Sequence, residues 1–117
     1  MNPDQLHRLV LLYLSVAYRT DHHFDPLERQ TTIQLARQWA KGLEAEYIDE
    51  VVDTAFAASR DELGEVAALA RELGQELTRE QRRHVLTDLG QIARADGYLS
   101  TNEAITISRI REIWGSL

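Results

Sequence analysis

Residues 93–103 read Ala-Arg-Ala-Asp-Gly-Tyr-Leu-Ser-Thr-Asn-Glu and contain, in order, the signals that end one helix and begin the next. Gly97 suits the left-handed conformation in which many helices end. Ser100 suits the position just before a helix, because its hydroxyl can accept a hydrogen bond from a first-turn amide, and Glu103 can reach back to the Ser100 amide. The stretch therefore predicts a helix–loop–helix unit with an acidic residue, Asp96 or Glu103, at each end of the loop.

The same pattern occurs in a weaker form 75 residues earlier, where Asp21, Phe24, Asp25 and Glu28 correspond to Asp96, Leu99, Ser100 and Glu103. At this offset, residues 8–39 and 83–114 share nine identities over 32 positions, and the identities include both tryptophans, Trp39 and Trp114. Such self-similarity indicates an internal duplication. The predicted repeat units span about residues 6–41 and 81–116.

Apolar residues recur at helical spacing along most of the chain, which predicts an all-α bundle of about six helices in one domain, residues 1–117. The first helix is expected from Asn2, Pro3 and Gln5 to about Asp21, and the second from Asp25 and Pro26 to Lys41 and Gly42. The third carries an apolar stripe from Tyr47 to Phe56. Capping-box pairs predict the starts of the remaining three helices, at Ser59 with Glu62, Thr78 with Gln81 and Ser100 with Glu103, and Gly74 is expected to end the fourth helix.

Composition narrows the classes of function. The chain has no cysteine, which excludes disulfides and thiolate zinc sites. The net charge of −6 argues against binding nucleic acid or an anionic membrane by bulk electrostatics. The apolar run Leu9–Leu14 is too short to span a bilayer and follows no basic segment, so we expect a cytoplasmic protein without membrane insertion.

The loop aspartates break a local rule, because a negative charge at the carboxyl end of a helix opposes the helix dipole. One explanation is that each carboxylate accepts loop amides or pairs with Arg19 or Arg94. The other is a divalent cation whose ligands are Asp21, Glu28, Asp96 and Glu103. Oxygen ligands favour Ca or Mg, whereas participation of His22 or His23 would favour Zn or Mn.

Residues 93–103 resemble the signature of the TerB-like tellurite-resistance family, in which Ala-Asp-Gly is followed by an apolar residue, a capping residue and Glu. The resemblance covers essentially the whole chain, and extends to the helical region preceding the J-domain in membrane-anchored co-chaperones. It implies a small helical module, acidic residues that bind divalent metal, and protein partners, some membrane-linked, in stress or metal-resistance systems. It implies no catalytic activity. Asp96 and Glu103 match the family pattern well, whereas the first copy has His22 and His23 after its aspartate.

Two other kinds of site are disfavoured. An EF-hand would need ligands where Ile92 and Arg94 stand. A metal-hydrolase site could be built around the His22–His23 pair, but there is no His-x-x-x-His pair and no nucleophile constellation, so we predict that the chain is not an enzyme.

The prediction is thus a metal-dependent adaptor or sensor. A metal-free interaction scaffold is the alternative, and the stripe of the third helix could then serve as a homodimer face. His7 and His84 are expected to be surface residues, and the two tryptophans to be core anchors.

Overall fold

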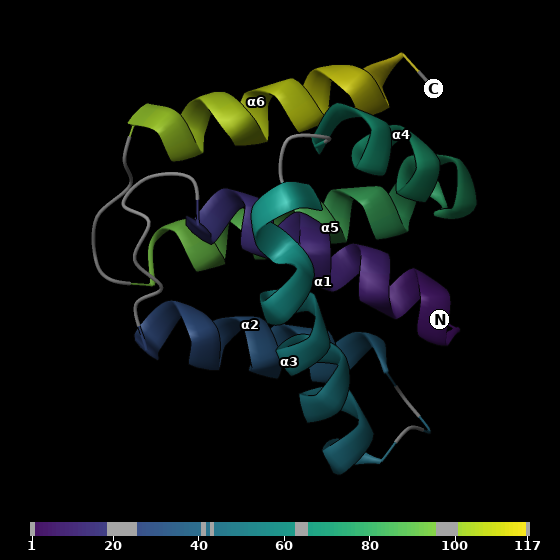
Figure 1. Ribbon diagram of the computed structural model, residues 1–117. Coiled ribbons are helices and arrows are strands. Elements are labelled where there is room, and N and C mark those ends of the chain that lie inside the picture. Colours follow the sequence, from purple (N-terminus) through teal and green to yellow (C-terminus); the bar gives the residue numbers. More distant parts are fainter. Residues whose placement is uncertain are drawn as a thin grey trace.

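The computed structural model describes residues 2–18, 26–40, 42, 44–62, 66–95 and 101–116. Within these ranges the chain forms six helices and no strand, which confirms the all-α fold class (Figure 1). The helices are α1 (Pro3–Tyr18), α2 (Pro26–Trp39), α3 (Ala45–Glu62), α4 (Val66–Glu76), α5 (Arg79–Ala93) and α6 (Thr101–Gly115). None of these helices is long and apolar enough to cross a membrane.

Two helix starts form as their local sequence predicts. At α1, the Asn2 side chain accepts a hydrogen bond from the Gln5 amide (2.8 Å), and the Gln5 side chain accepts one from the Asn2 amide (3.1 Å). The same reciprocal pair joins Thr78 and Gln81 at α5, at 3.1 and 2.8 Å. Each pair satisfies amides that have no partner within the helix.

The second helix also agrees with the prediction. Pro26 is its first residue, where the missing amide hydrogen costs nothing. The helix ends at Trp39, and Gly42 follows with a φ of 92°, in the left-handed region that glycine adopts without strain.

Three local predictions in the middle of the chain are wrong. Ser59 lies inside α3 and does not open a helix, because α3 continues to Glu62 and α4 begins only at Val66. Gly74 lies inside α4, where it is buried; tertiary packing overrides the cost of a helical glycine, about 1 kcal/mol. Tyr47 is 36% exposed, so the buried stripe of α3 is narrower than predicted.

Helix α1 is the centre of the packing. Every residue from Leu9 to Val16 is buried, as expected of a helix that is apolar around most of its circumference. One side of α1, including Leu12 and Tyr13, packs in a core cluster with α4, α5 and α6. The opposite side, including Val10 and Leu14, packs in a second cluster with α2 and α3. The two clusters therefore share one helix.

The helices of the two predicted helix–loop–helix units, α1 with α2 and α5 with α6, pack against each other. Helices α1 and α5 lie between α6 and α2 (Figure 1), and α1 contacts α6 while α2 contacts α5. The carboxyl ends of α1 and α5 and the amino ends of α2 and α6 all lie on the left of Figure 1. The described ends of all four helices that flank the predicted ligands thus lie on the same side of the molecule.

Candidate functional site

The four predicted metal ligands are described to different extents. Asp21 and Asp96 lie outside the described residues, as do His22 and His23. Glu28 is in the first turn of α2, and its side chain is not among those described. Only Glu103 can be placed in full.

Glu103 lies in the first turn of α6 and is buried, with 3% of its surface exposed. Its predicted capping partner, Ser100, lies outside the described residues. Burying an ionised carboxylate is unfavourable unless nearby positive charge or hydrogen bonds compensate. The amino end of α6 supplies part of that compensation through its helix dipole. Burial therefore distinguishes Glu103 from a capping glutamate at the surface.

Within the ranges that the structure describes, no three histidine, aspartate or glutamate side chains are grouped so that they could hold a metal ion. This does not bear on Asp21 or Asp96. The described part of the candidate metal centre is thus the buried Glu103, on the side of the molecule where four helix ends lie (Figure 1).

A second polar cluster, which the sequence analysis missed, surrounds Asp88 on α5. Asp88 is only 1% exposed. Its Oδ2 atom accepts hydrogen bonds from the Tyr13 hydroxyl (2.6 Å) and from the Trp39 indole Nε1 (2.9 Å). The Nε2 atom of His84, one turn earlier, lies 3.5 Å from Oδ1. The cluster joins α1, α2 and α5 through one carboxylate.

The outer side of this cluster reaches solvent through His84. Its side chain is 51% exposed, which confirms the prediction of a surface histidine, and its ring lies against Trp39 with centroids 4.7 Å apart. Trp114 is 5% exposed, as predicted for a core anchor, whereas Trp39 is only partly buried and packs against the core clusters.

Tyr13 lies on the buried side of the Asp88 cluster. Burial raises the pKa of its hydroxyl well above the ordinary value, and the Asp88 carboxylate raises it further. Tyr13 therefore remains a protonated donor, and both donors to Oδ2 are held within the bundle. Because Oδ2 is already occupied by two protein donors, we assign the cluster a structural role.

One feature of the sequence could have predicted the Asp88 cluster. The 75-residue offset pairs Tyr13 with Asp88, so the two equivalent positions of the repeat are in contact. Positions that correspond in this way meet wherever equivalent helices cross near a twofold axis. A tyrosine opposite an aspartate at such a crossing predicts a hydrogen bond.

The comparisons with known proteins give one result. The family model described as Tellurite resistance protein TerB matches residues 5–115. Neither the curated proteins nor the solved structures contain a significant match to the chain.

Proposed function

Because the chain belongs to the TerB family of tellurite resistance proteins, we propose that it is a non-enzymatic, cytoplasmic module that binds a divalent cation and acts as an adaptor or sensor for a protein partner. The ligands in this proposal are Asp21, Glu28, Asp96 and Glu103.

The observation that carries the proposal is the burial of Glu103 in the first turn of α6, on the side of the molecule where the carboxyl ends of α1 and α5 and the amino end of α2 also lie (Figure 1). A cation beside this carboxylate would add to the interactions that Glu103 already makes within the protein. Each loop supplies two carboxylates, fewer than the 6–8 oxygens that calcium takes, so two loops together with carbonyls and water suit the ion better than one loop alone.

A cation held by both loops would also link the α1–α2 hairpin to the α5–α6 hairpin. Since α1 belongs to both core clusters, a cation that holds these helices together would stabilise the whole bundle. Cation binding would thereby change the surface offered to a partner, which is the property that a sensor requires.

The test is a thermal melt after treatment with EDTA, repeated with Ca, Mg, Mn and Zn. A cation at 100 times its dissociation constant should stabilise the native state by about 2.7 kcal/mol. Asp96→Asn should lose most of this response. Asp4→Asn, which removes the same charge from the exposed first turn of α1, should respond as the wild type does. If no metal raises the wild-type midpoint, or if Asp96→Asn responds fully, the metal proposal is wrong.

A metal-free interaction scaffold is the second candidate. It is favoured by two large apolar side chains on the surface, Leu27 on α2 (53% exposed) and Ile105 on α6 (55%). If the partner is a second copy of the chain, sedimentation velocity should show a dimer in EDTA, and Ile105→Glu should weaken it. A monomer at every concentration would exclude the homodimer.

A further inference from the structure

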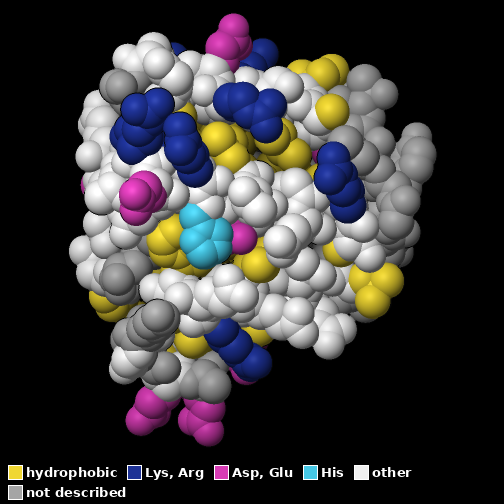
Figure 2. All heavy atoms as spheres, turned by 180° about the vertical axis from the view of Figure 1, so that it is seen from behind, with side chains coloured by type: hydrophobic (Ala, Val, Ile, Leu, Met, Phe, Trp, Pro, Cys, Tyr) yellow, Lys and Arg dark blue, Asp and Glu magenta, His cyan; other side chains and the backbone are white. Residues whose placement is uncertain are grey.

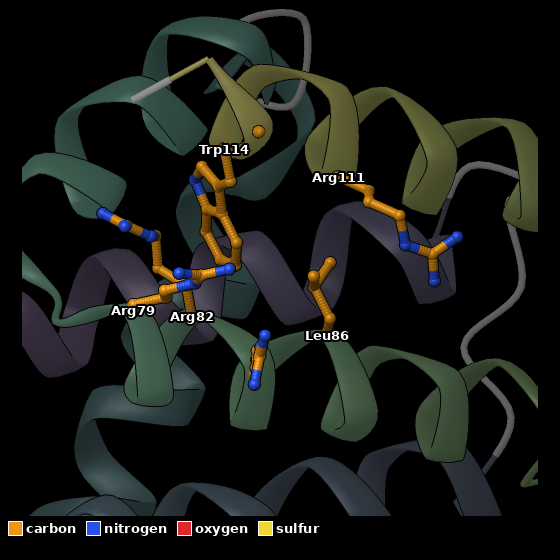
Figure 3. A pocket seen from close by; sticks show the side chains of 7 residues that line it. Arg79, Arg82, Leu86, Arg111 and Trp114 are labelled. Carbon is orange, nitrogen blue, oxygen red and sulfur yellow. The ribbon is translucent and has the colours of Figure 1, made fainter.

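A pocket of about 420 Å³ lies between the start of α5 and the end of α6 (Figure 3), at the opposite end of α6 from Glu103. Four arginines line it: Arg79, Arg82, Arg83 and Arg111. The remaining lining residues are Leu86, Trp114 and Gly115, and none of the seven is acidic. A volume of this size is within the range of small-molecule sites.

The arginines lie at both ends of an apolar floor. Arg79 and Arg82 lie beside Trp114, and Arg111 reaches from α6 on the far side of Leu86 (Figure 3). On the face turned away from the viewer in Figure 1, basic side chains surround a patch of apolar atoms (Figure 2). The pocket therefore presents positive charge from both α5 and α6 around the apolar surface of Leu86 and Trp114.

This positive charge is not balanced by the protein. Within the part of the chain that the structure describes, the arginine–carboxylate pairs belong to Arg8 and Arg37, and none involves a pocket arginine. The concentration of arginines occurs in a chain whose net charge is −6. These arginines also lower the stability of the start of α5. Arg79 and Arg83 repel each other one turn apart and lie near the positive end of the helix dipole.

Helix α4 holds part of the pocket in place. The Arg82 Nη1 atom donates to the Gly74 carbonyl (2.9 Å) and to the Leu77 carbonyl (3.3 Å). The Trp114 indole donates to the Ala70 carbonyl (2.7 Å). These bonds fix one guanidinium and the apolar floor before any ligand arrives, which lowers the entropic cost of binding.

At the 75-residue offset of the predicted repeat, other residue types stand at three of these four arginine positions. Arg79, Arg82 and Arg111 correspond to Asp4, His7 and Ala36. Arg83 corresponds to Arg8, whose guanidinium forms hydrogen bonds with the Glu76 carboxylate. The second copy thus carries three arginines with no counterpart in the first, and within the described residues no carboxylate forms an ion pair with them.

We propose that this pocket binds a small phosphate-bearing organic molecule, with phosphate oxygens on the guanidinium groups and an uncharged portion over Leu86 and Trp114. Guanidinium matches phosphate geometry with paired hydrogen bonds, and a phosphate carries enough negative charge to neutralise more than one arginine. The phosphate belongs either to a soluble metabolite or to a lipid headgroup.

The test is calorimetry in EDTA, so that no metal site contributes, with ATP, pyrophosphate and uncharged adenosine as probes. ATP and pyrophosphate should bind and adenosine should not. Arg83→Gln and Arg111→Gln should each weaken ATP binding by about tenfold, the value expected for one charge-assisted contact. Arg109→Gln is the matched control, since Arg109 is exposed on the same helix and lies outside the pocket. It should change binding by less than about twofold, because Arg109 does not line the pocket and its exposed charge makes no direct contact with a ligand there.

Vesicles of phosphatidylcholine with and without phosphatidic acid identify the source of the phosphate. Binding to phosphatidic acid vesicles that is lost in Arg83→Gln and Arg111→Gln, without binding of the soluble probes, assigns the site to a lipid headgroup. Binding of the soluble probes alone assigns it to a metabolite. The proposal is overturned if neither kind of probe binds, or if Arg109→Gln weakens binding as much as the two pocket variants do.

Discussion

At the scale of single residues, Asp88 is a polar side chain whose loss should be costly. Its carboxylate is the acceptor for both the Tyr13 hydroxyl and the Trp39 indole. Asp88→Ala leaves both donors without an acceptor and should lower the free energy of unfolding by about 2–4 kcal/mol. Asp88→Asn retains an acceptor oxygen and should lower it less. Urea unfolding of both variants checks this, and equal losses would show that the hydrogen bonds contribute little.

Tyr13 should give the protein a sensitivity to alkali. The pKa of its hydroxyl is raised above the ordinary value of 10.0 in the folded state. Its contribution to stability is therefore complete below pH 10 and declines as the pH rises through the folded-state pKa. Tyr13→Phe should be less stable at neutral pH and lose less stability above pH 10 than the wild type. Tyr47→Phe, at a surface position, is the control. Parallel pH profiles for wild type and Tyr13→Phe would contradict the assignment.

At the scale of helices, the starts could be predicted where the decisive contacts are local. The Thr78–Gln81 pair depends only on residues three apart, and the structure has it as predicted. Thr78→Ala should lower the free energy of unfolding by about 1 kcal/mol, whereas Thr78→Ser should be nearly neutral. Thermal melts of the two variants test this, and a neutral Thr78→Ala would mean that the hydroxyl adds nothing to the start of α5.

The predictions that failed at this scale depended on distant contacts. Ser59 with Glu62 has the same spacing as a true capping box, but α3 continues through it. Gly74 is a good helix stop in isolation, yet burial inside α4 retains it within the helix. Local sequence does not contain the tertiary packing that decides these two cases.

At the scale of the whole molecule, the two core clusters should unfold together because α1 contributes to both. Leu12→Ala lies in one cluster and Leu14→Ala in the other, and each should cost about 2–5 kcal/mol. For each variant, the transitions measured by far-UV circular dichroism and tryptophan fluorescence should coincide. Separate transitions in either variant would show that the clusters are independent units.

Of the candidate sites, only the acidic loops could be predicted from the sequence. The acidic loops stand out because each repeats a recognisable local pattern. The Asp88 cluster and the arginine pocket do not, because their members come from different helices and meet only through packing. The repeat itself remains a prediction, and the contact between positions 13 and 88 agrees with it.

That contact has a consequence for how two similar halves can share one chain. In a symmetric dimer of separate halves, the residue at a twofold crossing always meets its own copy, so it would be tyrosine against tyrosine or carboxylate against carboxylate. In a chain that arose by duplication, covalent linkage would remove this constraint and let one position specialise as donor, as Tyr13 does here, and the other as acceptor, as Asp88 does. Once the two positions have specialised, neither half can be exchanged for a second copy of the other, and each is committed to its own place in the chain.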